Sequence, residues 1–160
     1  MTYHYSRIAV VALLSFLLTA CSSDNSGRYA ESDTTSAQSQ FLLDNASRQG
    51  VQTTSSGLQY EVIKASEGAK PSATSTVTVH YVGTLIDGTE FDSSYSRNAP
   101  ATFPLGNTIK GWVEGVQLMS VGSQYRFVIP SELAYGDRGA GQDIKPGDTL
   151  IFSIELLSVE

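Results

Sequence analysis

The sequence has few of the residues on which most enzymes build their chemistry. It contains one cysteine, Cys21, and two histidines, His4 and His80. A single cysteine excludes an intramolecular disulfide. Because His4 falls in the N-terminal signal described below, one histidine and one cysteine remain for a metal site that usually needs three or four ligands. We therefore expect no bound metal.

Motifs for nucleophilic catalysis and for phosphate binding are also missing. The sequence has no GxSxG nucleophile elbow, and its glycines are scattered at predicted turns instead of gathered in a phosphate-binding loop. His80 is the one histidine left to act as a base, and strand alternation points it away from the neighbouring apolar row. We therefore expect neither a Ser-His-Asp hydrolase nor a cofactor.

Positive charge is scarce as well. The chain has 10 Lys and Arg against 16 Asp and Glu, for a formal net charge of -6, and the basic residues form no cluster. Nucleic acid requires a basic face, because contacts with its phosphates dominate the affinity. Nucleic acid is therefore excluded as an expected partner.

The hydrophobic segment at the N-terminus is short. It covers Ile8–Leu18, which is too few residues to span a bilayer but fits the apolar part of a secretory signal. The ending Leu-Thr-Ala-Cys at residues 18–21 closely resembles the lipobox of bacterial lipoproteins, in which cleavage leaves an acylated cysteine. We predict a signal peptide at 1–20 and lipidation of Cys21. The alternative is a plain signal peptide with an incidental cysteine.

A lipid on Cys21 would anchor the protein to a membrane of the bacterial cell envelope. Several acyl chains hold a protein firmly in a bilayer, whereas one chain does so only marginally. Ser22 follows the cysteine instead of aspartate. By the sorting rule of enteric bacteria, this resembles an outer-membrane address, with the domain facing the periplasm or the cell surface.

Between the signal and the domain, the chain is polar. Residues 22–40 are rich in Ser and Thr and have almost nothing to bury, so we predict a disordered tether at 21–40. Residues 41–56 are expected to form a short helical lead-in, with Gly50 closing the helix. The folded domain is then expected at 57–160.

Period-two alternation dominates the domain and predicts half-buried antiparallel strands. Asp87-Gly88 predicts a hairpin turn. Trp112, Val116 and Met119 recur at helical spacing and predict one amphipathic helix. The expected fold class is α+β, with a curved antiparallel β-sheet wrapped around one short α-helix. The predicted strands are GLQYEVIK, TVTVHYVGTL, QYRFVIP and TLIFSIELL.

A set of aromatic and aliphatic side chains remains as the candidate functional surface. Its simplest interpretation is that these residues form the core. Trp112 is the informative member, because it follows Gly111 at the predicted helix start, where its ring could form the floor of a pocket. The set consists of Tyr81, Phe91, Phe103, Ile109, Trp112, Tyr135, Ile144 and Phe152.

Five motifs stand in the order and near the spacing of a known family. They are VTVHYVGTLIDGTEFDSS, PATFPL, IKGWVEGVQLM, LAYG and GDTLIFSIELL. Over about Gly57–Glu160 the chain resembles the FKBP-type peptidyl-prolyl cis-trans isomerases, and most of all their bacterial members of the macrophage-infectivity-potentiator type. The resemblance implies an FKBP-like fold and catalysis of X–Pro amide rotation in exported or envelope proteins, without covalent or metal catalysis.

The resemblance also assigns roles by motif match. Trp112 would form the floor of the proline pocket. The backbone N–H of Ile109 and the hydroxyl of Tyr135 would hold substrate carbonyls. Asp92 would be the one acidic residue of the pocket, with a turn or strand-end residue as the alternative. The implied catalytic residues are Tyr81, Phe91, Asp92, Trp112, Tyr135 and Phe152, and the implied substrate-binding residues are Phe103, Ile109 and Ile144.

The sequence departs from the family pattern in three places, the third of which is a pair of neighbouring residues. Ala101 stands where the small drug-binding members have Phe, Lys110 where many bacterial relatives have Pro, and Gln142 and Asp143 where relatives carry smaller or more apolar residues. The first and third departures weaken the case for tight binding of macrolide inhibitors, the second ligand class that the family implies beside proline-containing polypeptides. Ser93 and Ser94 are interpreted as turn formers.

Two other functions stay open at this point. The same cleft could serve a non-catalytic peptide-binding module or chaperone. A surface protein recruited to host interaction is the third possibility.

Overall fold

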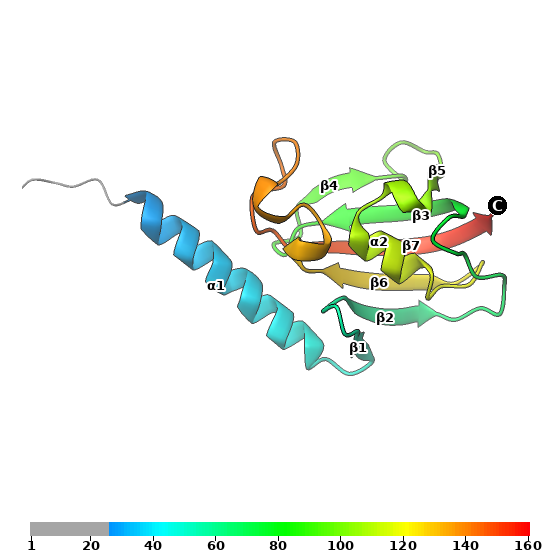
Figure 1. The fold of residues 1–160 in the computed structure, drawn as a ribbon, viewed down its shortest axis with the longest axis horizontal. Coiled ribbons are helices and arrows are strands. Elements are labelled where there is room, and N and C mark those ends of the chain that lie inside the picture. The colour runs from blue at the N-terminus through cyan, green and yellow to red at the C-terminus, as the bar shows by residue number, and fades with distance from the viewer. Residues whose placement is uncertain (1–25) are drawn as a thin grey trace, which may run out of the picture.

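A computed structural model describes residues 26–160 of the chain (Figure 1). The predicted signal peptide at 1–20 and Cys21 lie outside the described residues. Within residues 26–160, every helix is too short or too polar to cross a membrane.

The domain is built on a curved antiparallel sheet, as the sequence predicts. The strands lie in the order β1-β2-β6-β7-β3-β4, and β5 pairs with β3 outside this path. The fold class is therefore confirmed as α+β, with a curved antiparallel sheet and a short α-helix against it. The strands are β1 (Val51–Thr53), β2 (Gln59–Lys64), β3 (Thr76–Thr84), β4 (Glu90–Ser93), β5 (Ala101–Pro104), β6 (Gln124–Ile129) and β7 (Leu150–Val159).

Strand β3 positions two shorter strands along one of its edges. Its first half pairs with β5 and its second half with β4, which places Gly83 opposite Asp92. Its other edge pairs with β7, where Gly83 lies opposite Phe152. Burial alternates strictly along β3, with Tyr81 facing the core and His80 facing away from it. The predicted alternation of this strand is therefore confirmed.

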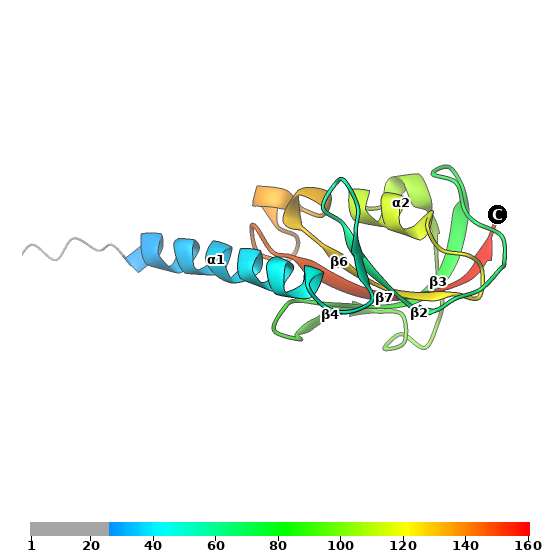
Figure 2. The same ribbon diagram turned by 90° about the horizontal axis from the view of Figure 1, so that it is seen from below.

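Helix α2 (Lys110–Val116) lies across the concave face of the sheet (Figure 2). A Cβ atom on Gly111 would lie 2.4 Å from Cγ2 of Ile129, and one on Gly115 would lie 2.6 Å from Cε1 of Phe127. Two glycines one turn apart therefore let the helix backbone rest directly on β6. The apolar side chains predicted to share the helix face, including Val116, are buried.

Strand β2 departs from its predicted pattern. We expected Val62 to share a buried side with Leu58, but Val62 is 37% exposed and Ile63 is 54% exposed. The pairing with β6 shifts register between Val62 and Lys64, and β1 covers only the first half of the other edge. The end of β2 therefore leaves the core.

The largest difference from the sequence expectation is helix α1 (Ser26–Ala46). Residues 26–40, expected to be a disordered tether, belong to this helix. The predicted lead-in at 41–56 is helical only to Ala46 and then contains β1. Gly50 adopts a positive φ of 87° in the turn before β1, four residues beyond the helix end. The sequence lacks an apolar stripe here, and hydropathy therefore gave no signal for a helix.

Helix α1 is held to the domain by a polar seam, which we define as Gln38, Asn45, Gln59, Arg126 and Asp148. At one end of the polar seam, near the C-terminus of α1, the Asn45 side chain donates to Oε1 of Gln59 at 2.7 Å and accepts from Nη1 of Arg126 at 3.0 Å. Near the other, the Gln38 side chain donates to Oδ1 of Asp148 at 3.0 Å. Directional hydrogen bonds between side chains thus dock a helix that has little to offer a hydrophobic core.

Candidate active site

Four aromatic rings gather above the sheet around the indole of Trp112. The Trp112 ring meets Tyr81 at 5.2 Å and 88°, Phe152 at 5.3 Å and 88°, and Phe103 at 5.8 Å and 89°. These are edge-to-face contacts, which aromatic rings favour over direct stacking. Three edges therefore fix the plane of the indole. Phe91 completes the wall by packing edge-on against Phe152 at 5.5 Å.

These rings enclose an open cavity of about 440 Å³. Trp112 is largely buried, with 5% of the residue exposed, and it nevertheless lines this cavity. All nine residues that the sequence analysis assigned to a pocket line this cavity. Its lining consists of Tyr81, Phe91, Asp92, Phe103, Asn107, Thr108, Ile109, Trp112, Tyr135, Ile144 and Phe152.

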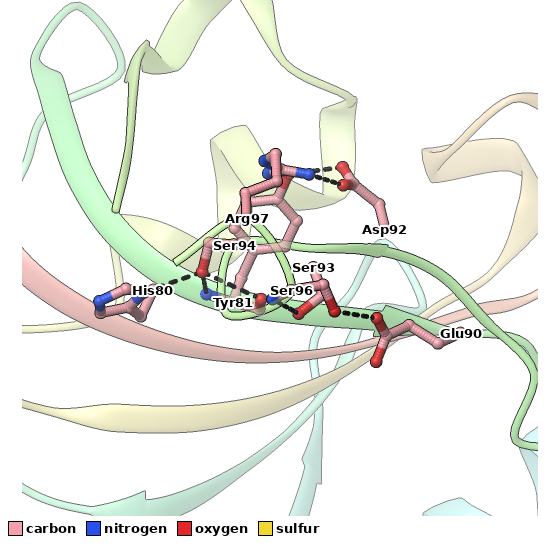
Figure 3. A network of polar contacts seen from close by, with 8 residues as sticks. All are labelled: His80, Tyr81, Glu90, Asp92, Ser93, Ser94, Ser96 and Arg97. Atoms are coloured by element: carbon pink, nitrogen blue, oxygen red, sulfur yellow. Dashed lines mark hydrogen bonds and ion pairs between the residues drawn. The ribbon is translucent and has the colours of Figure 1, made fainter. Parts of the chain in front are cut away.

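Asp92 forms the polar corner of the cavity. Figure 3 shows its carboxylate facing Arg97. Its carboxylate accepts a hydrogen bond from the Tyr81 hydroxyl at 2.5 Å and a charged one from Arg97. Arg97 also donates to the Tyr81 hydroxyl oxygen at 2.8 Å. The three groups close a triangle in which one carboxylate faces one guanidinium, and the corner therefore carries no net charge.

The pKa values of this corner keep its charges fixed near neutral pH. Burial raises the pKa of Asp92, but the hydrogen bonds from Tyr81 and Arg97 outweigh burial and lower the pKa below its ordinary 3.8. Burial, followed by the bond to Asp92, raises the pKa of Tyr81 above its ordinary 10.0. Asp92 is therefore a carboxylate and Tyr81 a neutral hydroxyl donor over the physiological range.

Ser94 holds the backbone of Tyr81 in place (Figure 3). Its hydroxyl accepts from the backbone N–H of Tyr81 at 2.8 Å and lies 2.9 Å from Nδ1 of His80. Ser94 is fully buried, so this serine and histidine, although adjacent, cannot meet a substrate as a nucleophile and base. Our interpretation of Ser94 as a turn former is incomplete, because the side chain also anchors a strand.

A loop at residues 134–149, which we call the pocket loop, carries the last two lining residues. Tyr135 lies at its start and is 42% exposed, and Ile144 lies near its end. Residues 140 and 144 hold each other through two backbone hydrogen bonds of 2.8 and 3.1 Å. In Figure 2 the pocket loop lies on the same side of the sheet as α2.

The sequence analysis missed three residues of this site. Asn107 and Thr108 line the cavity from the 3₁₀ turn before α2, and Arg97 completes the polar corner. Arg97 follows Asp92 by five residues in the sequence. This spacing was the one hint that the two side chains could pair, and it is too common to predict an ion pair. None of the positions that depart from the family pattern lines the cavity: Ala101, Lys110, Gln142 and Asp143.

No three side chains of His, Cys, Asp or Glu come together as a metal site in the part of the chain that the structure describes.

Comparison with known proteins gives two family matches. Residues 67–157 match the family described as FKBP-type peptidyl-prolyl cis-trans isomerase. Residues 21–62 match the domain amino terminal to FKBP-type peptidyl-prolyl isomerase. The first match covers β3 to β6, α2, most of β7 and all eleven lining residues, whereas β1 and most of β2 lie in the second match.

Individual relatives agree with these matches. The chain is 57% identical over 121 residues to the FKBP-type peptidyl-prolyl cis-trans isomerase FkpA of Aeromonas hydrophila, covering 76% of this chain and 45% of the relative. It is 51% identical over 120 residues to the outer membrane protein MIP of Legionella longbeachae, covering 75% of this chain and 52% of the relative.

The crystal structure of FkpA from Escherichia coli superposes with a TM-score of 0.79 at 42% identity, covering 83% of this chain and 62% of that one. The chain spans about half the length of the curated relatives it matches, between 44% and 58% of the first four.

Proposed function

Because this chain belongs to the family of FKBP-type peptidyl-prolyl cis-trans isomerases, we propose that it catalyses the rotation of X–Pro amide bonds in polypeptides that enter the Trp112 cavity. The observation that carries this proposal is the open, aromatic-walled cavity with one charge-balanced polar corner. Its size suits a small ring with its flanking peptide groups, and it presents no group arranged for bond cleavage.

The reaction suits such a cavity because it requires no bond to the protein. Rotation of the amide faces a barrier of about 20 kcal/mol and takes tens of seconds unaided. The planar amide is stabilised by resonance that places negative charge on its oxygen, and dry apolar walls disfavour this separation of charge. The twisted amide loses less on entering such walls, so binding favours the transition state.

The lining residues take distinct parts in the proposed mechanism. The indole of Trp112 supports the proline ring, with Tyr81, Phe91 and Phe152 as walls and Phe103 and Ile144 as further apolar lining. The backbone N–H of Ile109 and the hydroxyl of Tyr135 hold the neighbouring substrate carbonyls. Asp92, kept ionised by Tyr81 and Arg97, polarises the entrance without exchanging a proton. Macrolide inhibitors would compete for the same cavity.

An isomerisation assay with a proline-containing peptide tests this function. We expect Trp112→Ala to lower kcat/KM at least about tenfold, a loss of about 1.4 kcal/mol in transition-state stabilisation. Asp92→Ala is expected to lower it less. Glu67→Ala removes an exposed acid that does not line the cavity, and it serves as the control with unchanged activity.

An inactive wild-type chain that still binds the peptide would favour the non-catalytic peptide-binding module. Full activity in both the Trp112 and the Asp92 variants would contradict the proposed site.

We further propose that Cys21 carries a lipid that anchors the chain to a bacterial envelope membrane, with the outer membrane favoured. The proposal rests on the lipobox-like residues 18–21 and on the apolar run before them. The similarity to the outer membrane protein MIP of Legionella longbeachae supports it. The domain would then meet exported or envelope proteins as substrates.

Fractionation of cells that produce the full chain tests the anchor. Cys21→Ala is expected to move the protein from the membrane to the soluble fraction, because acyl chains contribute roughly 0.8 kcal/mol of membrane binding per buried methylene. Ser22→Ala is the matched control and should remain at the membrane. Retention of the Cys21 variant would contradict acylation.

A further inference from the structure

The contact between helix α1 and the pocket loop is more than a docking point. The Gln38 side chain donates to Oδ1 of Asp148 at 3.0 Å, and its oxygen accepts from the backbone N–H of Thr149 at 3.0 Å. One amide group therefore grips two successive residues at the base of the pocket loop. All three residues are shielded from solvent, with exposed fractions of 9% for Gln38, 7% for Asp148 and 1% for Thr149.

From Asp148 the hydrogen bonds continue toward the cavity. The second carboxylate oxygen of Asp148 accepts from the backbone N–H of Lys145 at 2.7 Å, next to Ile144. The turn at residues 145–148 is closed by a bond from Asp148 N to Lys145 O at 3.2 Å. Its Gly147 donates to the carbonyl of Gly136 at 3.0 Å, beside Tyr135. Ile144 is therefore adjacent to Lys145, and Tyr135 is adjacent to Gly136. Lys145 and Gly136 both take part in these hydrogen bonds.

Apart from backbone hydrogen bonds within it, the pocket loop is held by the partly buried side chains of Ala134 and Ile144. Its outer part is exposed at Asp137, Arg138, and residues 141–143. A loop with few buried apolar contacts opens easily unless its ends are fixed. The base at Asp148 and Thr149 is its most buried part, and the side-chain partner there comes from α1, 110 positions earlier in the chain.

We propose that Gln38 is a positioning residue for substrate binding. By fixing Asp148 and Thr149, it keeps Ile144 and Tyr135 over the cavity and so lowers the entropy that the pocket loop loses when a peptide binds. Gln38 is not one of the residues that line the cavity, and its side-chain hydrogen bonds reach Asp148 and Thr149. This inference rests on the proposed function of the cavity.

The first test compares two glutamines of α1 in the full chain. Gln38→Ala removes the bonds to Asp148 and Thr149. Gln40→Ala makes the same change at an exposed position, where the side chain bonds to Asp44 of the same helix at 2.8 Å. We expect Gln38→Ala to raise amide hydrogen exchange at Lys145 and Thr149 and to raise the KM for a proline tetrapeptide roughly three- to tenfold, the size of one or two hydrogen bonds. We expect kcat to stay near the wild-type value.

A second readout does not depend on turnover. Trp112 is the only tryptophan of the chain and lines the cavity, so its fluorescence reports peptide binding directly. The dissociation constant measured in this way should rise in Gln38→Ala by the same factor as KM. A wild-type chain that binds without turnover would overturn the proposed function, while this shift would still establish the role of Gln38.

Exchanging the donor and the acceptor between positions 38 and 148 shows whether Gln38 acts by positioning the pocket loop or by stabilising the whole protein. Gln38→Glu places a second carboxylate beside Asp148, and we expect it to raise exchange and KM at least as much as Gln38→Ala. Adding Asp148→Asn restores every bond. The amide introduced at position 148 donates to the carboxylate introduced at position 38, and its oxygen accepts from the backbone N–H of Lys145. The carboxylate at position 38 also accepts from the backbone N–H of Thr149. The double variant should return to within about twofold of wild type.

Two results would overturn the proposal. One is equal KM and equal exchange at Lys145 in Gln38→Ala and Gln40→Ala. The other is failure of the double variant to recover although its thermal unfolding matches that of wild type.

Discussion

The two α-helices within residues 26–160 contact the same sheet domain through opposite chemistry. Helix α2 rests on β6 through Gly111 and Gly115, with apolar side chains filling the space around them. Helix α1 docks through the polar seam, in which Gln38 and Asn45 make side-chain hydrogen bonds two turns apart. The α2 contact depends on close packing of many atoms, whereas the α1 contact depends on a few directional hydrogen bonds.

This difference teaches which contact the fold requires. Apolar packing at interior density tolerates neither added nor removed atoms, so an error under α2 disturbs the sheet and the Trp112 cavity together. A typical hydrogen bond adds only about 1 kcal/mol net, so the polar seam can lose a bond while the domain stays folded. The α1 contact is therefore suited to adjusting the pocket loop, and the α2 contact to building the site.

The largest expected effect breaks the α2 contact. Replacing Gly111 and Gly115 together with Ala should lower the free energy of unfolding by at least about 3 kcal/mol, because each added methyl overlaps a side chain of β6. Helix propensity alone predicts the opposite sign, since Ala is favoured over Gly by about 1 kcal/mol in a helix interior. Chemical denaturation measures the change.

The control for this pair is Lys110→Ala, at an exposed position of the same helix. Equal stability of the control and the double glycine variant would mean that α2 does not need close contact with β6.

A middle-sized effect breaks the polar seam at its far end. Asn45→Ala should cost about 1.5 kcal/mol of stability, because the amide of Gln59 and the guanidinium of Arg126 lose a buried partner. Exchange at Lys145 and the KM should stay unchanged, since the Gln38 bonds are untouched. Faster exchange at Lys145 would show that the polar seam acts as one unit instead of two separate ends.

The smallest expected effect is the pH dependence of activity. It tests the polar corner, which contains ionisable groups, separately from the apolar walls. The lowered pKa of Asp92 gives stability that is present above the ordinary carboxyl pKa and is lost as the pH falls through the folded-state value. The pKa of Tyr81 is raised. Activity should therefore be level between about pH 5 and pH 9.

Arg97→Gln removes a charged donor from Asp92 and should move the acid limit of activity to higher pH. Arg138→Gln, on the exposed outer part of the pocket loop, is the control and should leave the profile unchanged. A bell-shaped rate profile centred near pH 7 in wild type would contradict a site without proton transfer.

Much of the site was accessible from the sequence because its members lie in regular elements. The alternation in β3 oriented Tyr81, the helical spacing oriented Trp112, and the family motifs identified residues such as Asp92. Arg97 was missed because it sits in an irregular loop, where no periodicity relates a side chain to its target. Val62 was misplaced because a register shift in β2 interrupts an otherwise regular pattern.

The sequence alone determined the α+β class and the short helix that carries Trp112, because the hydrophobic period is a local property of the chain. Tertiary structure decided the extent of α1 and its grip on the pocket loop. The physical reason is that the bonds of Gln38 join residues 110 and 111 positions apart, and such pairs of polar side chains leave no trace in local hydropathy.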